Sequence, residues 1–380
     1  MGWPDAESAG EVDRRLGWPD PRAAVSRETP VDLPDAAEPG PKGGEHEAAD
    51  DPPAGDEPVE RPEDPQDDVE AADAARDRAE LAAEIPNVGP DTPVAQELAE
   101  NARRRIRLTG RAFPKPAGGT RVLTVANQKG GVGKTTTAVN TAAALAQSGL
   151  QVLVVDLDPQ GNASTALGID HHADLPSVYD VLVRDKPLAE VVQPCAAVPG
   201  LRCAPATIDL AGAEIELVSL VARESRLKRA LQAAALEEQG YDYVLIDCPP
   251  SLGLLTVNAL VAAEEVFIPI QCEYYALEGL SQLLKNIELV RSHLNAALHV
   301  STILLTMYDG RTRLSAQVAE EVREHFPEQT LRTTVPRSVR ISEAPSFSET
   351  VMTYDPSSSG ALAYLEAASE IAQRGAAGAI

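Results

Sequence analysis

A glycine-rich run that ends in Lys-Thr constrains this chain more than any other feature. Gln128 to Thr135 reads Gln-Lys-Gly-Gly-Val-Gly-Lys-Thr, and it follows an apolar run, Arg121 to Asn127, that suits a buried parallel strand. After it, Thr136 to Gln147 is rich in Ala and Leu and closes at Gly149, which predicts a helix with a C-terminal glycine. Strand, glycine loop and helix in this order are what a phosphate-binding loop requires. The sequence therefore predicts an α/β fold with a mostly parallel central sheet flanked by helices.

The residue types in this loop match the chemistry of a nucleotide phosphate. Glycines let the backbone curl so that its N–H groups face the anion, and the helix N-terminus adds a positive dipole. We expect Lys134 to contact the β- and γ-phosphates and the Thr135 hydroxyl to join the shell of Mg²⁺, which prefers oxygen ligands. Lys129 adds a second cation, although a lysine there can also be an ordinary surface residue. The expected ATP-binding residues are Lys129, Gly130, Gly131, Val132, Gly133, Lys134, Thr135 and Thr136.

Three carboxylates follow two further predicted strands. Gln151 to Val155 is a buried strand that places Asp156 and Asp158 at its carboxyl end, and Tyr243 to Ile246 is another that ends at Asp247. Ligands bind at the carboxyl ends of strands in open α/β sheets. Each aspartate alone can equally be a helix cap or a turn residue. Three of them together with a phosphate loop favour a site for Mg²⁺ and catalysis.

Composition divides the chain into a tail and a domain. Residues 1–100 carry 28 Asp or Glu against 8 Lys or Arg, which is −20 of the net charge of −25. They also hold 15 of the 30 prolines and only 12 Leu, Ile, Val or Phe, too little apolar surface to offset the entropy of ordering a chain. We predict a disordered, acidic, Pro-rich tail over residues 1–93, a basic helix and linker over residues 94–119, and one α/β domain over residues 120–375.

Two short features precede the predicted domain. The tetrapeptide Gly-Trp-Pro-Asp occurs twice and carries both tryptophans, Trp3 and Trp18. Exposed aromatic residues beside prolines can anchor in the groove of a partner, so these motifs predict a partner for the tail, with a chance duplication as the alternative. Residues 94–108 have helical apolar spacing and end in an arginine cluster that is either a solvated helix end or a contact for nucleic acid or an acidic surface.

Several classes of protein are disfavoured by the composition. No apolar run approaches the 18 residues that a membrane helix needs, and the N-terminus lacks a basic start and an apolar core, so we expect neither a membrane-spanning nor a signal-directed secreted protein. The four cysteines lie in apolar contexts without metal-ligand spacing, which is typical of buried thiols in a reducing cytoplasm. The acidic balance argues against attraction of nucleic acid by the whole molecule, yet most of the acidity lies in the tail.

At this point the motifs are similar to those of a known family. Lys129-Gly-Gly-Val-Gly-Lys-Thr135, Val155-Asp-Leu-Asp-Pro-Gln-Gly-Asn162 and Tyr243-Val-Leu-Ile-Asp-Cys-Pro-Pro-Ser251 resemble the deviant Walker A P-loop ATPases of the ParA/Soj chromosome-partitioning family. The resemblance covers about Arg121 to Ala372. It includes three later stretches, which are closer to this family than to its cell-division relative MinD: Glu273-Tyr-Tyr-Ala-Leu-Glu-Gly279, Met307-Tyr-Asp-Gly-Arg311 and Pro336-Arg-Ser-Val-Arg-Ile-Ser-Glu-Ala-Pro345.

The resemblance implies a role for each site residue. Lys129 would reach across an ATP-dependent homodimer to the nucleotide of the other subunit. Asp158 would position the attacking water, and Asp247 would be the Walker B carboxylate that holds Mg²⁺ through water. Asp156 would support the Mg²⁺ shell. The expected catalytic residues are Lys129, Lys134 and Asp158, and the expected metal-site residues are Thr135, Asp156 and Asp247.

The resemblance also implies partners. Arg311 and Arg340 match positions that line the DNA-contacting surface of the family's dimer, and guanidinium groups suit phosphate contacts without sequence readout. We therefore expect a weak ATPase whose ATP-bound dimer binds non-specific double-stranded DNA, and whose hydrolysis a ParB-like centromere-binding protein stimulates. A cytoplasmic, nucleoid-associated protein follows from this. Arg323 lies within the predicted helix from Ser315 to His325, where an ordinary solvated ion pair is the alternative to a DNA contact.

Other readings stay open. The same ATPase could position a protein cargo or act on membranes like MinD, although the C-terminal residues 371–380 lack a bulky apolar face. An iron-sulfur reductase or an amidating synthetase on the same fold is a third hypothesis, and the missing cluster cysteines disfavour the reductase. A scaffold that binds nucleotide without turnover is a fourth. Finally, Ala213 to Gln239 predicts one long helix that packs Val218, Val221, Leu227, Leu231 and Leu236 along a broad apolar side.

Overall fold

The computed structural model describes residues 92, 99, 101, 103, 104, 112–236, 238–274 and 276–378. Apart from Thr92, the predicted disordered tail lies outside these residues, as do both tryptophan motifs and most of the predicted basic helix. Ala99, Asn101, Arg103 and Arg104 are helical.

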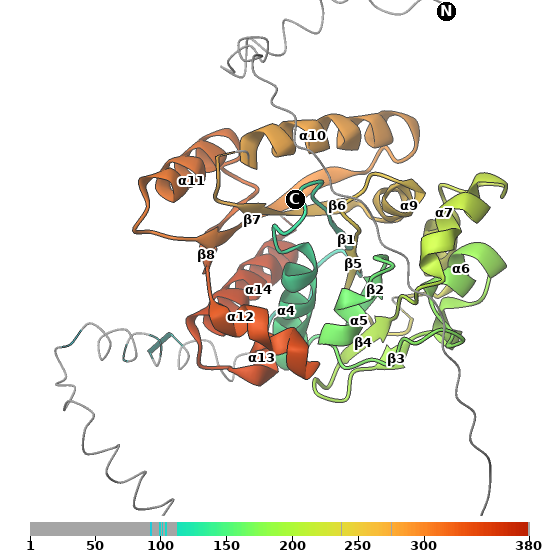
Figure 1. Cartoon of the computed structure of the whole chain (residues 1–380), viewed down its shortest axis with the longest axis horizontal. Coiled ribbons are helices and arrows are strands. Elements are labelled where there is room, and N and C mark those ends of the chain that lie inside the picture. Colours follow the sequence, from blue (N-terminus) through green and yellow to red (C-terminus); the bar gives the residue numbers. More distant parts are fainter. Residues whose placement is uncertain are drawn as a thin grey trace, which may run out of the picture. The chain divides into compact units, whose positions relative to one another are not determined.

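One eight-stranded sheet forms the centre of the described residues, in the order β3-β4-β2-β5-β1-β6-β7-β8 (Figure 1). Neighbouring strands are parallel except for the short edge strand β3. The mostly parallel sheet predicted from the sequence is therefore confirmed. The strands are β1 Arg121–Val125, β2 Val152–Asp156, β3 Gln193–Pro194, β4 Leu201–Ala204, β5 Tyr243–Asp247, β6 Glu265–Gln271, β7 His299–Tyr308 and β8 Thr330–Pro336.

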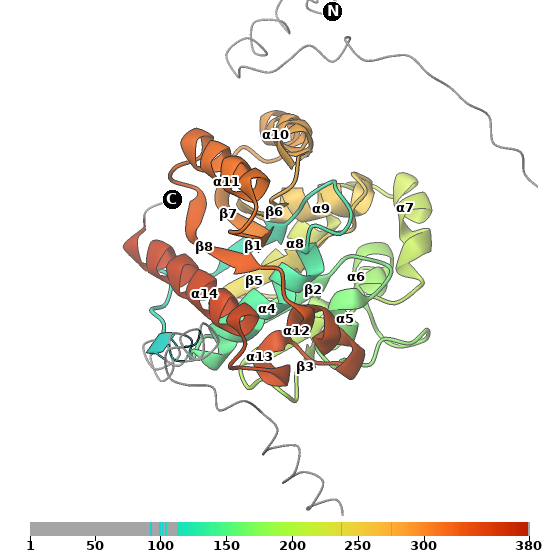
Figure 2. The same cartoon turned by 60° about the vertical axis from the view of Figure 1, so that its left-hand side comes forward.

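Helices cover both faces of the sheet, as a parallel sheet requires (Figure 2). Helices α4 and α14 pack on one face, and α8, α9, α10 and α11 belong to the layer on the other. The α-helices are α4 Lys134–Gln147, α5 Asn162–Ala166, α6 Val178–Arg184, α7 Leu210–Val218, α8 Arg226–Ala233, α9 Leu254–Ala262, α10 Ala276–His293, α11 Arg313–His325, α12 Val339–Glu343, α13 Val351–Tyr354 and α14 Ser359–Ala377, with short 3-10 turns at η2 Leu188–Glu190 and η3 Ala344–Phe347.

The central strands are apolar along their whole length because both of their faces are covered. Every residue of β2 and β5 is buried, including the aspartate that ends each strand. Alternate residues face opposite layers: Val154 and Leu245 belong to the core under α4 and α14, whereas Val155 and Ile246 belong to the core under α8 and α9. Burial of this kind holds the strand ends, and the polar residues that follow them, in fixed positions.

The prediction of one helix from Ala213 to Gln239 was wrong. The chain instead forms α7 and α8, separated by a turn in which Ala222 adopts a left-handed φ of 52°. Two tertiary contacts hold the break: the Asn258 amide donates to the carbonyl of Arg223, and the buried Arg226 side chain donates to the carbonyl of Leu182. The apolar spacing predicted that Val221 packs against the domain, but Val221 lies in this turn and is 87% exposed.

A segment before β1 lies against the domain. The Phe113 side chain is buried in the core under α4, and its N–H donates to the carbonyl of Ser148 at 3.0 Å. The N–H of Ala117 donates to the carbonyl of Gly375 in α14, and Lys115 forms an ion pair with Asp242. Residues 113–117 thus run across the ends of α4 and α14 before entering the sheet.

Candidate nucleotide-binding site

The glycine loop between β1 and α4 has the backbone shape of an anion cradle. Gly131 and Gly133 have φ values of 74° and 88°, in the left-handed region that favours glycine. Gly133 is the N-cap of α4 and provides no capping side chain, so the first turn of the helix keeps its N–H groups for another acceptor. A helix N-terminus of this kind attracts a phosphate.

The loop is held by side chains whose role sequence reasoning missed. The Thr306 hydroxyl in β7 donates to the carbonyl of Val132 at 2.9 Å. The Asn127 side chain accepts the N–H of Lys129 at 3.0 Å and donates to the carbonyl of Pro269 at 2.8 Å. Asn127 at the end of a predicted strand was the one visible signal, since a buried amide at a strand end normally needs such partners.

Lys134 is buried inside the loop rather than extended into solvent. Its side chain is 7% exposed, and the ammonium donates to the carbonyl of Lys129 across a long 3.4 Å. Burial lowers the pKa of Lys134, and the negative charges of Asp247 and Asp158 counteract part of that shift. A weakly bonded ammonium in the curl of the loop is placed to bind a phosphate oxygen.

Asp247 has the environment that best fits a bound cation. It is fully buried, and neither of its carboxylate oxygens has a hydrogen-bond partner of normal geometry among the described residues. Burial raises its pKa well above the usual range, and neighbouring Asp156 raises it further, while the nearby Thr135 hydroxyl lowers it. A buried polar group without a partner is costly, and Mg²⁺ takes oxygen ligands of this type. Asp247 and Thr135 therefore fit a Mg²⁺ site.

Asp156 lies directly beside Asp247 because β2 and β5 pair in register at these two residues. Unlike Asp247, it is fully bonded within the chain: one oxygen accepts the N–H of Asp158, and the other accepts the N–H and the hydroxyl of Ser164 at 2.9 and 2.7 Å. Burial raises the pKa of Asp156 to about 6, although these hydrogen bonds lower it. Asp156 orients the loop that carries Asp158, and its role towards Mg²⁺ stays a prediction.

Asp158 is placed at the mouth of the same site. Its side chain is 9% exposed and accepts the N–H of Gln160 at 3.0 Å, and its charge acts on both Lys134 and Asp247. The structure thus brings the predicted loop and all three predicted aspartates together at one edge of the sheet.

The second lysine of the loop has a partner that the sequence did not indicate. The ammonium of Lys129 lies 3.1 Å from a carboxylate oxygen of Glu273, in the loop after β6. The strands β1 and β6 are neighbours, so their following loops meet at the carboxyl edge. Glu273 belongs to a motif that carried the family resemblance, without an assigned role.

The two predicted DNA-binding arginines lie beyond the phosphate loop, after β7 and β8. Arg311 is 92% exposed and pairs with Asp309 at 3.0 Å. Arg340 in α12 is 55% exposed and pairs with Glu343 at 3.1 Å and Asp355 at 3.4 Å. Exposed pairs of this kind contribute little to stability, so both guanidinium groups can exchange their partners for a phosphate.

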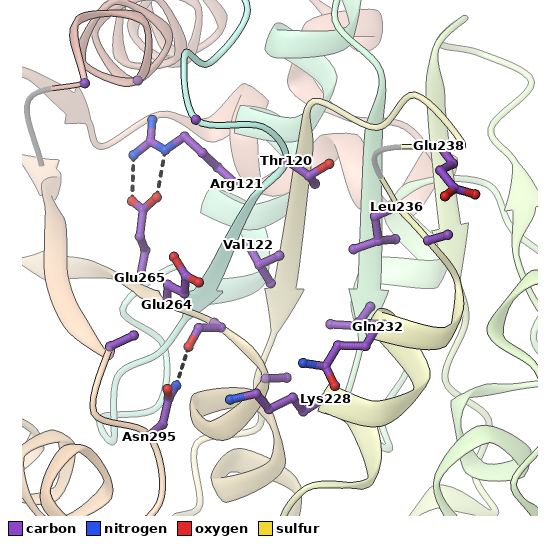
Figure 3. A pocket seen from close by; sticks show the side chains of 18 residues that line it. Thr120, Arg121, Val122, Lys228, Gln232, Leu236, Glu238, Glu264, Glu265 and Asn295 are labelled. Carbon is purple, nitrogen blue, oxygen red and sulfur yellow. Dashed lines mark hydrogen bonds and ion pairs between the residues drawn. The ribbon is translucent and has the colours of Figure 1, made fainter.

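A cavity of about 740 Å³ lies at the opposite, amino edge of the sheet (Figure 3). Figure 3 shows Arg121 and Glu265 facing each other there, with two hydrogen bonds of 2.7 and 2.6 Å between nearly buried side chains. Asn295 in its wall donates to the carbonyls of Leu260 and Ala263. Arg121 and Glu265 thus bind each other, and Asn295 binds the backbone, so these polar groups stabilise the sheet edge.

The fold and the site define a P-loop nucleotide-binding α/β protein, and comparisons with known proteins refine this class. Residues 120–300 match a family described as an AAA domain. The chain is 54% identical over 255 residues to the sporulation initiation inhibitor protein Soj of Bacillus subtilis, which spans 67% of this chain and 99% of Soj. It is 51% identical over 254 residues to the chromosome partitioning protein ParA of Myxococcus xanthus, spanning 67% of this chain and 88% of ParA.

A solved structure of cobyrinic acid a,c-diamide synthase from Mycobacterium smegmatis, with bound ATP analog and magnesium, is 41% identical with a TM-score of 0.58. It covers 67% of this chain and 95% of that one. The identity to Soj and ParA over nearly their whole lengths places this chain in the ParA/Soj family of chromosome-partitioning ATPases. The family predicted from the motifs is confirmed.

Proposed function

We propose that this chain binds MgATP at the loop from Lys129 to Thr136, forms an ATP-dependent homodimer on non-specific double-stranded DNA, and is released after hydrolysis stimulated by a ParB-like partner. The observation that supports this most strongly is the environment of Asp247: its buried carboxylate has no hydrogen-bond partner of normal geometry within the described part of the chain, and Lys134 and Thr135 are its neighbours. The related structure contains a bound ATP analog and magnesium, which supports the proposal that this chain binds MgATP.

The residues divide the work of phosphoryl transfer. Bound Mg²⁺ neutralises phosphate charge. Lys134 and the N–H groups of the loop would hold the phosphate oxygens, and the metal would be held by the Thr135 hydroxyl and, through water, by Asp247. Asp158, held by Gln160 and by the loop that Asp156 orients, positions the nucleophile. Because the protein mainly orients groups and compensates charge, small displacements of Asp158 change the rate strongly.

Four exposed large apolar side chains in the segment after β4 support the homodimer. Ile208 follows β4 at the carboxyl edge, and Ile215, Val218 and Val221 continue along and beyond α7; their exposed fractions are 61%, 79%, 59% and 87%. Four large apolar side chains this exposed are typical of a surface that a partner covers. A second copy that brings its own Lys129 to the nucleotide would lie on this side.

The assignment of Asp158 is tested by replacing it with alanine. The Asp158→Ala variant is expected to keep ATP-dependent DNA binding, because Lys134 and Asp247 remain, and to lose phosphate release by at least 100-fold. Phosphate release and DNA binding are measured on the same preparation. Asp170→Ala, at an exposed aspartate, is the matched control. Normal hydrolysis by Asp158→Ala would refute the assigned role.

The DNA surface is tested by reversing its charges. Arg311→Glu with Arg340→Glu is expected to lower DNA affinity at least tenfold and to leave nucleotide affinity unchanged, since phosphate contacts supply most of non-specific binding. Arg184→Glu serves as the control, because Arg184 is also exposed and ion-paired but lies on α6. If the double variant bound DNA with unchanged affinity, Arg311 and Arg340 would not be part of the DNA-binding surface.

The synthase similarity makes amide synthesis the second candidate. Amidation from glutamine by a chain alone would need a reactive thiolate. All four cysteines are buried, and burial raises the pKa of each thiol, most strongly for Cys203 and Cys248. A thiol in such surroundings is a poor nucleophile. Assay of ammonia release from glutamine with MgATP separates the candidates, and release would favour the synthase.

The predicted alternative of membrane or cargo positioning is addressed by helix α14. None of the described helices is long and apolar enough to cross a membrane. The apolar residues Leu362, Leu365 and Ile371 of α14 are buried against the domain, so they would have to leave the core to bind a lipid surface. Vesicle sedimentation with and without ATP tests this alternative.

A further inference from the structure

The carboxylate of Glu273 lies between two cations and a fixed donor. One oxygen is 3.1 Å from the ammonium of Lys129. The other accepts a hydrogen bond from the amide of Gln271, the last residue of β6, and lies 3.7 Å from a guanidinium nitrogen of Arg337. Gln271 is nearly buried, so Glu273 keeps an anchor that does not depend on the lysine.

Only the side chain of Lys129 is free to change partners. Its N–H is bonded to Asn127 at 3.0 Å, and its carbonyl accepts the ammonium of Lys134. The side chains of Lys129 and Glu273 are 34% and 45% exposed. Their ion pair is therefore a weak, partly exposed contact and not a buried ion pair. The backbone of the loop can therefore stay in place while the lysine rotates.

A phosphate and Glu273 compete for the same ammonium. If Lys129 stayed on Glu273 while binding a phosphate, two negative groups would lie on one small cation, and their repulsion would weaken both contacts. If Lys129 turned to the phosphate, Gln271 and Arg337 would retain the carboxylate. Binding of a nucleotide by Lys129 thus requires breaking the pair with Glu273.

We propose that Glu273 is a positioning residue that holds Lys129 in a resting position, so that the nucleotide must displace it before the lysine can act. This inference rests on the proposed function, in which Lys129 contacts a phosphate. The expected change in nucleotide affinity follows from the free energy of an exposed ion pair. Removing the pair of Lys129 with Glu273 is expected to tighten nucleotide binding about two- to fivefold.

A double-mutant cycle tests the resting position. The affinity of a fluorescent, non-hydrolysable ATP analogue with Mg²⁺ is measured for the full chain and for Glu273→Gln, Lys129→Ala and the double variant. Glu273→Gln keeps the shape of the side chain and removes the charge. Glu278→Gln, an exposed glutamate five residues away, is the control for the change in net charge.

The expected result is tighter binding by Glu273→Gln alone, no change with Glu278→Gln, and no effect of Glu273→Gln when Lys129 is already alanine. Unchanged or weaker binding by Glu273→Gln, or the same change in the Lys129→Ala background, would overturn the resting position. Light scattering with ATP on the wild-type chain is read separately: a monomer there contradicts the proposed dimer, and the cycle then tests the contact of Lys129 with the phosphate of its own subunit.

Discussion

At the scale of single residues, two neighbouring aspartates have opposite environments. Asp156 and Asp247 end adjacent strands in register, yet the oxygens of Asp156 take three hydrogen bonds and those of Asp247 take none of normal geometry from the described residues. The free chain thus carries a destabilising carboxylate at its functional centre. Such sites lower the stability of the free protein and favour binding, because the ligand provides the partner that the buried carboxylate lacks in the fold.

Asp247→Asn is therefore expected to stabilise the metal- and nucleotide-free chain at pH 8 by about 1–3 kcal/mol, since it removes an unpaired buried charge. It should also abolish the rise in melting temperature that MgATP produces in the wild type. Thermal unfolding with and without MgATP measures both effects. Asp170→Asn is the control, and a variant less stable than wild type at pH 8 would contradict the assignment.

The same pair predicts a pH dependence. The folded-state pKa of Asp156 is about 6, above its unfolded value, and burial raises that of Asp247 as well. Each raised pKa means that the folded chain binds more protons than the unfolded chain, so the contribution of Asp156 to stability falls as pH rises from about 4 through about 6. The raised pKa of Asp247 has the same sign, so the advantage of Asp247→Asn should shrink as the pH is lowered from 8 towards the unfolded value of about 4, and a constant gap would refute the shift.

At the scale of elements, the sequence predicted those parts of the fold whose signals are local. The strands β1, β2 and β5 and helix α4 follow from apolar runs and the glycine loop, within a residue or two at each end. The break between α7 and α8 was not predictable, because it depends on Asn258 and Arg226 making contacts with distant carbonyls. Tertiary contacts override helical periodicity in such cases.

The site was predictable as a set of residues but not as a set of contacts. Each aspartate could be placed at a strand end, whereas the register of Asp156 with Asp247 needed the strand order β2-β5-β1. The pair of Lys129 with Glu273 likewise needed β6 beside β1. Residues 144 positions apart give no pairwise signal in one sequence.

The segment before β1 provides a prediction at this scale. Phe113 is 8% exposed and packs in the core with α4 and α14, so Phe113→Ala is expected to lower the free energy of unfolding by about 2–4 kcal/mol. Lys115→Ala should cost less than about 1 kcal/mol, because the Lys115 side chain is 69% exposed and the nearly buried Asp242 keeps its hydrogen bond from the N–H of Gln151. Urea unfolding compares the two, and equal stability of Phe113→Ala and wild type would mean that this segment is not part of the domain.

At the scale of the whole molecule, charge is distributed unevenly. Residues 1–100 carry −20 of the −25 net charge, and the remaining 280 residues are close to balance. The acidity of the whole chain therefore does not argue against the proposed DNA contacts of Arg311 and Arg340. Under the proposed function, two copies in a dimer would double the phosphate contacts, so ATP-driven dimerisation would raise DNA affinity steeply and make it sensitive to salt.

The most direct test of the account is fluorescence anisotropy of the full chain on a random-sequence duplex, with MgATP or MgADP, across a salt titration. We predict binding with MgATP that weakens steeply as salt rises, and at least tenfold weaker binding with MgADP. Equal affinity with both nucleotides, or no binding with either at low salt, would contradict an ATP-switched DNA-binding dimer.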